Sequence, residues 1–543
     1  MAKRLRMRAP AACPRTLVAP VAMLALLMAP QCRADWRITP SVELRQIYSD
    51  NVKLDADPLA RSQFITDLAP SLAIANHGPR LKLTAAFTTH LFAYSSERVE
   101  NTNRSQRQLA ANARARLIED LLFFDATASI NQRAISAFGP QVANNGYAGA
   151  NRAEVRTWRL SPYLAHHFGA TATAELRYAR DAVASNNVGL GNRVGSVGNV
   201  GNSTGNSLGD SIGNTVSASI SSGPAFRTIG WGLRASHQNL DSTRGGESTE
   251  DTASSQLNWH MSEALSVNAS YGYDKYNYQA LAGATAGASY SLGLVWTPSR
   301  RTQLRASAGK RYYGNSYMLN ATHRSRHTVW NVSYNDAVTT TRGEFLRPVS
   351  IDTATLLDGL FSATISDPVA RQQAVDAYIR SNGLPASIIQ STNSFSNRYI
   401  LQKQFQASAA FNTAKTITVL SLNATRRNAL STPETAGATP GSLPGSGFDS
   451  LSDNAKQAGA ALTFNYRISP RGGANLVVSK TRTESLATGI KDEQMLLSLG
   501  LARQLQRKLK GAVELRHVRG NALTPGGRSY RENALSASLS QQF

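Results

Sequence analysis

The chain has 543 residues, of which 41% are hydrophobic and 17% charged, and its formal net charge is +23. No stretch beyond the N-terminal segment approaches the roughly 20 consecutive apolar residues that a membrane helix needs, which excludes a helical membrane protein. This length suits two or three soluble domains, and it also suits one large β-barrel with long loops.

Residues 1–34 have the features of a secretory signal peptide: a basic start, an apolar core at Leu17–Met28 and small residues before a cleavage point. We expect the exported chain to begin at Asp35. Lipid attachment at Cys32 is a disfavoured alternative, because the residues before it do not fit a lipidation site. Both cysteines, Cys13 and Cys32, lie in this segment, so the exported part is expected to have no disulfide and no thiolate metal site.

The chain remains strongly positive without this segment. Removal of its six basic residues lowers the net charge from +23 to +17. Such an excess attracts anions. For an exported protein it indicates lipopolysaccharide phosphates, anionic glycans or an anion-attracting pore, and not nucleic acid. Outer-membrane lipid and lipopolysaccharide are therefore the expected surroundings.

From residue 35 onward, apolar and polar residues alternate in segments separated by turn residues. In Arg80–Tyr94, for example, Leu81 and Phe87 fall on one face and Lys82 on the other. Short connections such as His77-Gly78-Pro79 alternate with long polar ones. The pattern predicts an all-β fold, a transmembrane antiparallel β-barrel of about 22 strands (roughly 18–24) with both termini in the periplasm.

Two inserts interrupt the predicted strands of the barrel, which occupies residues 35–543. Residues 184–214 are rich in Gly and Asn and are expected to form a mobile outer loop. Residues 342–395 carry helical spacing, with Asp367-Pro368 as a helix start and Gly383 as a helix stop. We expect a small helical insert there, which either caps the mouth of the barrel or plugs the lumen.

Eight basic residues lie opposite the apolar face of their predicted strands and are expected to line the lumen. They are Lys82, Arg114, Arg116, Arg177, Arg234, Arg305, Arg311 and Arg516. They could form an electropositive pore that concentrates anionic solutes or glycans. Alternatively, they could pair with acidic residues across the barrel and brace its wall.

Aromatic residues near the predicted strand ends, among them Trp158, Tyr163, Tyr276, Tyr312 and Tyr399, are expected at the membrane interfaces. Stacking of sugars on those that face the lumen is the alternative.

Motifs that could indicate catalysis or metal binding have weak contexts. Gly201-Asn202-Ser203-Thr204-Gly205 matches a nucleophile elbow, but it lies in the Gly/Asn-rich segment and not between a strand and a helix. His166 and His167 are adjacent in a predicted strand and should point to opposite faces. The sequence therefore predicts no enzyme, no cofactor and no metal site.

At Arg300-Arg301-Thr302, Arg311-Tyr312-Tyr313-Gly314, Arg324, Trp330, Tyr334 and Thr339-Thr340-Thr341-Arg342, the sequence resembles one family across most of the exported chain. This is the PEP-CTERM/exosortase system-associated outer-membrane β-barrel family, which is related to porin-type barrels. The resemblance implies a partnership with exopolysaccharide or with its export proteins. The family has no established catalytic residues, so none is carried over.

The last segment, Arg531–Phe543, alternates with Leu535, Leu539 and Phe543 on one face. A final strand that ends in Phe resembles the assembly signal of outer-membrane barrels, so Phe543 is expected to contact the outer-membrane assembly machinery.

The favoured function is a porin-like channel that exports exopolysaccharide or passes anionic solutes. The alternative is a structural surface barrel that anchors matrix or sorted proteins without transport. A siderophore-type receptor is disfavoured, because strands are predicted from about Arg37, which leaves no room for a large N-terminal plug.

Overall fold

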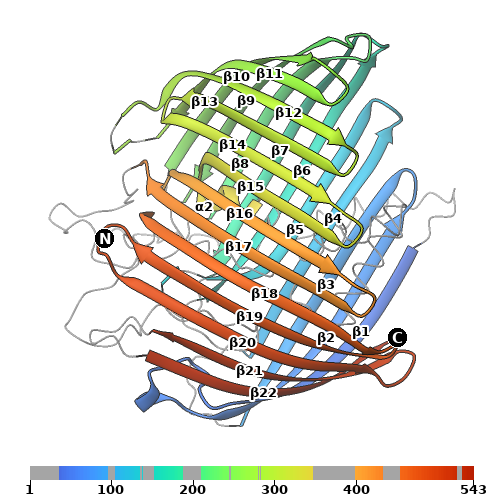
Figure 1. Cartoon of the computed structure of the whole chain (residues 1–543), viewed down its shortest axis with the longest axis vertical. Coiled ribbons are helices and arrows are strands. Elements are labelled where there is room, and N and C mark those ends of the chain that lie inside the picture. Colours follow the sequence, from blue (N-terminus) through green and yellow to red (C-terminus); the bar gives the residue numbers. More distant parts are fainter. Residues whose placement is uncertain are drawn as a thin grey trace, which may run out of the picture.

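A computed structural model describes residues 36–95, 104–134, 137–138, 152–186, 210–243, 246–278, 280–281, 283–346, 398–431, 453–521 and 529–543. Within these residues, 22 strands form a single sheet that closes on itself, because β1 pairs with both β2 and β22 (Figure 1). Every pairing is antiparallel, which confirms the predicted fold and strand number. The expected signal peptide lies outside the described residues.

The first half of the sheet comprises β1 (Trp36–Ser49), β2 (Gln63–His77), β3 (Leu81–Tyr94), β4 (Ser105–Ile118), β5 (Leu122–Ala134), β6 (Arg152–Phe168), β7 (Ala172–Asn186), β8 (Ser211–Ser222), β9 (Ile229–Ser242), β10 (Gly246–His260) and β11 (Leu265–Asn277). The second half comprises β12 (Ala286–Ser299), β13 (Thr302–Arg311), β14 (Gly314–Arg324), β15 (Thr328–Thr339), β16 (Ile400–Asn412), β17 (Thr416–Ala429), β18 (Ala455–Ser469), β19 (Gly472–Ser485), β20 (Lys491–Gln504), β21 (Leu509–Asn521) and β22 (Ser529–Gln542). Among the described residues, two short helices, η1 (Asp57–Leu59) and α2 (Thr341–Leu346), lie in the connections. No helix in the described part of the chain is long and apolar enough to cross a membrane.

Tight turns join the strands at one rim, as predicted. The β2–β3 turn occupies residues 78–80, and the β6–β7 turn contains Gly169 at φ +57°, a conformation that glycine adopts without strain. The first strand begins and the last strand ends at this rim, where the Phe543 N–H donates to the Pro40 carbonyl at 3.0 Å. Most connections at the opposite rim are long.

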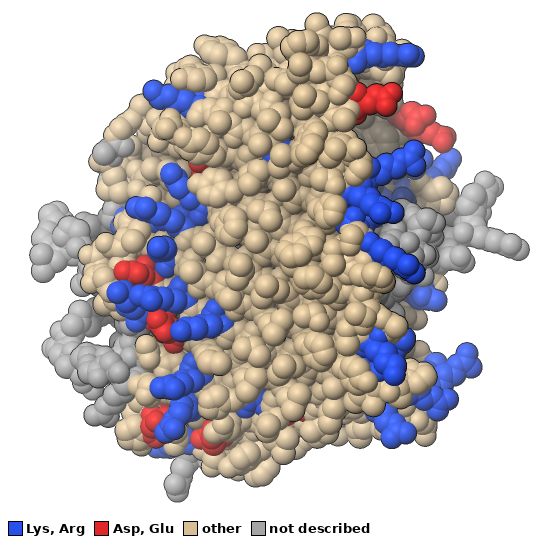
Figure 2. Space-filling model, viewed as in Figure 1, with Lys and Arg blue, Asp and Glu red and all other residues tan. Residues whose placement is uncertain are grey.

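The outer face of the wall is apolar around its middle. Leu44 lies opposite Leu68 on one side and Leu539 on the other, and these side chains are 40–49% exposed. Figure 2 shows the result as a band almost free of charged residues, with Lys and Arg at both its edges. A contiguous apolar surface of this extent on a closed barrel is a lipid-facing surface. The protein is therefore an outer-membrane β-barrel, and the rim of tight turns is the periplasmic rim.

The inserts differ from the expectation at their edges. Strands β7 and β8 extend into the expected Gly/Asn-rich loop, so that residues 184–186 and 211–214 are strand and only 187–209 lie outside the described residues. Of the expected helical insert, Arg342 to Leu346 are described and belong to α2. The helices expected near Asp352 and Pro368 lie outside the described residues.

Candidate functional site

The inner face of the barrel follows from the register. Side chains alternate between the two faces of a strand, and two residues that pair across neighbouring strands point to the same face. Following the pairings from strand to strand around the ring therefore assigns every residue to the inner or the outer face, and the assignment is the same on return to β1. Residues that pair across the inner face include Arg114 with Asp125 and Ser270 with Ser291. All eight basic residues that the sequence suggested for the lumen lie on this face.

Four of these eight residues are exposed and make no ion pair among the described residues. Lys82 is the second residue of β3, and Arg116 lies near the end of β4, so both are close to the periplasmic rim. Arg234 and Arg305 lie in the periplasmic halves of β9 and β13. We call this set the four lumenal cations. Their charges are not neutralised by described carboxylates, so they leave a positive potential in the periplasmic half of the lumen.

The first of the ion-paired residues lie on β4 and β7. Arg114 Nε donates to Asp125 Oδ1 at 2.9 Å, and Arg177 Nη1 donates to Asp125 Oδ2 at 3.2 Å. Arg177 also donates to Glu175 at 2.8 Å, and its guanidinium lies over the Tyr163 ring at 3.8 Å. This part of the wall is braced by charge pairs, as the alternative interpretation of the sequence proposed.

The remaining two residues, Arg311 and Arg516, form ion pairs with acidic residues on other strands. Arg311 donates two hydrogen bonds to Asp274, at 3.0 and 3.1 Å. Arg516 lies 3.2 Å from Glu532, which also accepts a hydrogen bond from the Ser49 hydroxyl at 2.8 Å. These acids come from other strands, so sequence reasoning that considered only nearby acids missed them. Knowledge of the strand register would have found them.

Helix α2 contacts the inner faces of β6 and β7 and, from the other side, that of β17, so it joins walls that are distant along the ring. The Arg342 side chain forms a buried ion pair with Asp181 of β7, and its Nε donates to Ser211 at 2.9 Å. Phe345 packs in a buried cluster with Val155 and Val183. From the other side, Arg427 of β17 donates to the Thr341 hydroxyl at 3.4 Å.

Two further segments pack inward at the extracellular side. Val52 and Leu54, from the β1–β2 connection, are each 2% exposed in a cluster with Tyr530. Phe138, which follows β5, is 2% exposed and packs with Ala455 of β18. The inward contacts of described connections are thus concentrated at the extracellular side, while the four lumenal cations lie toward the periplasm.

A group of tyrosines lines the lumen at its extracellular side. The Tyr278 and Tyr399 rings are stacked with centroids 4.5 Å apart, and the Tyr312 and Tyr276 centroids are 5.2 Å apart. Burial raises the pKa of the Tyr278 and Tyr312 hydroxyls. The expectation of membrane-interface positions is wrong for Tyr276, Tyr312 and Tyr399, because Tyr276 has the parity of the inner face and the other two rings pack in its group. It is also wrong for Tyr163, which stacks under Arg177 inside the barrel.

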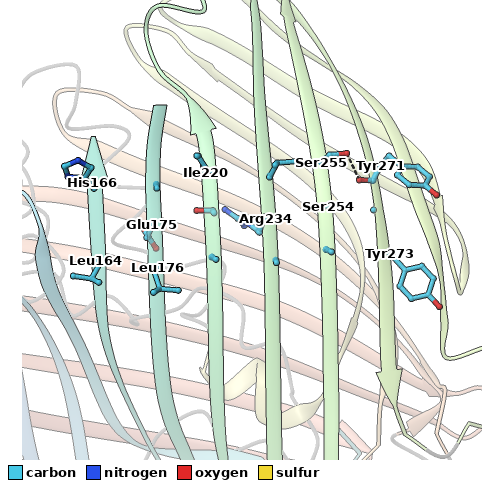
Figure 3. A pocket seen from close by; sticks show the side chains of 17 residues that line it. Leu164, His166, Glu175, Leu176, Ile220, Arg234, Ser254, Ser255, Tyr271 and Tyr273 are labelled. Atoms are coloured by element: carbon cyan, nitrogen blue, oxygen red, sulfur yellow. Dashed lines mark hydrogen bonds between the residues drawn. The ribbon is translucent and has the colours of Figure 1, made fainter. Parts of the chain in front are cut away.

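The outer wall has a hollow of about 720 Å³ across β6–β11 (Figure 3). Its lining includes the small residues Ala218 and Ala235 and the larger residues Leu176, Leu233 and Tyr273. Most of these residues have the parity of the lipid-facing side, so the hollow lies outside the lumen. No group of three or more His, Cys, Asp or Glu residues in the described part of the chain could hold a metal ion.

Comparisons with known proteins assign this chain to no family. No protein-family model matches the sequence, and no curated protein matches it. Among solved structures, the siderophore receptor PirA from Pseudomonas aeruginosa is 8% identical with a TM-score of 0.45, covering 94% of this chain and 81% of that one. The FrpB iron transporter from Neisseria meningitidis is 8% identical with a TM-score of 0.47, covering 93% of this chain and 82% of that one.

Proposed function

We propose that the barrel is a channel that exports exopolysaccharide or passes anionic solutes through its lumen. The observation that carries this proposal is the set of four lumenal cations, Lys82, Arg116, Arg234 and Arg305, which are exposed and have no ion pair among the described residues. Unpaired charges on the wall of a lumen raise the local concentration of counter-ions. Their place in the periplasmic half of the lumen suits the capture of anions from the periplasm.

A second feature supports a polysaccharide as the exported solute. The inner faces of β15–β20 carry amides and hydroxyls, such as Gln404, Asn423 and Asn465, and the charged residues there lie near the rims. Amide and hydroxyl groups can exchange hydrogen bonds with sugar hydroxyls. The resemblance to the PEP-CTERM/exosortase-associated family favours exopolysaccharide among the polymers, with its export proteins as partners.

The proposal is tested by ion selectivity. The mature chain and a variant with Lys82→Gln, Arg116→Gln, Arg234→Gln and Arg305→Gln are reconstituted in planar bilayers under a potassium chloride gradient, and the reversal potential is measured. We expect the unmodified barrel to prefer chloride and the variant to lose most of that preference. In a control variant, four outward-facing cations, Lys403, Arg426, Lys456 and Lys480, are each replaced by Gln. This control should keep the preference for chloride. Equal selectivity of all three proteins would contradict the proposal.

The alternative is a structural barrel without transport. The observations that favour it are the inward-packed segments at the extracellular side, above all helix α2 between β7 and β17. This alternative predicts that no form of the protein conducts ions.

A further inference from the structure

Three basic side chains form a row on the outer face of the barrel. The register places Lys403 of β16 directly opposite Arg426 of β17, and Arg426 directly opposite Lys456 of β18. We call Lys403, Arg426 and Lys456 the outer cation row. Like charges that face each other across strands destabilise a sheet. Two such pairs in succession indicate that a counter-charge comes from outside the sheet.

The row has no acidic partner among the described residues, although an acid lies opposite each of its ends. Asp336 faces Lys403, but its carboxylate accepts hydrogen bonds from the Ser316 hydroxyl and the Tyr317 N–H at 2.9 and 3.0 Å. Glu484 faces Lys456, and its carboxylate lies 3.9 Å from Lys491 Nζ. The Asp336 carboxylate is therefore hydrogen-bonded to other groups, while Glu484 makes only a long, exposed contact with Lys491.

The row lies at the extracellular border of the lipid-facing surface. Lys403 and Lys456 lie near the starts of β16 and β18, and Arg426 lies near the end of β17, so all three are at the rim opposite the tight turns. Further toward the membrane centre on the same outer face, Phe405 and Leu422 are 37% and 43% exposed. Figure 2 shows Lys and Arg side chains along the left edge of the apolar band, where the extracellular ends of β16–β18 lie in Figure 1.

Cations directly above an apolar wall match an amphipathic lipid whose headgroup is anionic. Lys and Arg are the residues that bind phosphate, Arg through two parallel hydrogen bonds and Lys as a point charge. We propose that the outer cation row binds the phosphorylated headgroup of a lipid in the outer leaflet, whose acyl chains pack against the wall below. This site is independent of what passes through the lumen.

The test compares lipid binding by two variants that lose the same charge. The full mature barrel, refolded in detergent, is mixed with diphosphoryl lipid A or with the same lipid after its phosphates have been removed, and the bound lipid is counted by native mass spectrometry. The first variant carries Lys403→Gln, Arg426→Gln and Lys456→Gln on the outer face. The second carries Lys82→Gln, Arg234→Gln and Arg305→Gln in the lumen.

We expect the outer-face variant to bind diphosphoryl lipid A at least tenfold more weakly, and the lumenal variant to bind it like the unmodified barrel. The dephosphorylated lipid should bind weakly to all three proteins. Equal binding of the two lipids, or equal losses in the two variants, would overturn the proposal. Displacement of the lipid by millimolar inorganic phosphate would also overturn it, since the row would then be a site for free anions. The single variant Arg426→Gln, at an exposed position, gives the same comparison if the triple variant does not refold.

Discussion

Replacement of Arg342 by methionine would test how helix α2 is held across the lumen. The substitution keeps an unbranched side chain but leaves Asp181 without its cation, and these two residues are 5% and 2% exposed. Removing one partner of a buried ion pair costs about 3–5 kcal/mol, because the other charge stays buried and uncompensated. Most of that cost is avoided if α2 leaves β7, since Asp181 then contacts water.

The expected change in the population of the detached helix follows from the loss of the ion pair alone. Because a factor of ten corresponds to about 1.4 kcal/mol, the loss of about 3–5 kcal/mol should raise the population of the detached helix by about two to four powers of ten. The packing of Phe345 against Val155 and Val183 opposes detachment in both proteins, so it does not change this ratio.

Hydrogen–deuterium exchange of the α2 amides measures the detached population. We expect faster exchange at residues 341–346 in Arg342→Met, and slower exchange again when Asp181→Asn is added, because no stranded charge is then left. Arg300→Met, in an exposed periplasmic turn, is the matched control and should not change the exchange. Unchanged protection of α2 in Arg342→Met would refute the reasoning.

Three other predictions concern the ion pair between β21 and β22, the C-terminal Phe543 and the β1–β2 connection. Arg516→Met leaves Glu532 buried, so the free energy of unfolding in urea should fall by about 3–5 kcal/mol and recover in part when Glu532→Gln is added; an unchanged midpoint would contradict the role of this pair. Phe543→Ser should slow assembly into membranes that contain the assembly machinery but not refolding into detergent, as followed by the gel shift of the folded barrel, and equal effects on both would contradict a signal role. Burial raises the pKa of the Asp55 carboxyl, with Lys53 and Arg61 opposing the shift, so folding of the β1–β2 connection should weaken as pH rises from the ordinary Asp pKa through the raised one. Amide exchange of residues 50–62 should show that trend in the unmodified chain and not in Asp55→Asn.

The strand pattern was predictable from the sequence because side-chain alternation is a local signal. The alternation in Arg80–Tyr94 identified β3 and placed Lys82 on the inner face, and the short turns identified the periplasmic rim. The parity of the eight basic residues followed from the same local pattern.

Contacts between distant strands were not predictable in this way. The pairing of Arg311 with Asp274, of Arg516 with Glu532 and of Arg342 with Asp181 depends on the register and on the closure of the ring. The inward position of Tyr276 likewise depends on which face of β11 meets the lumen, and an aromatic residue near a strand end suits either face.

Single-channel conductance of the mature chain in a planar bilayer, with and without residues 347–397, tests the channel most directly. The shortened chain shows whether that segment controls the opening of the pore. We predict discrete conductance steps that favour chloride over potassium, in the complete chain or in the shortened one. The absence of conductance in both chains, with the barrel folded by its gel shift, would contradict a channel and leave the structural barrel.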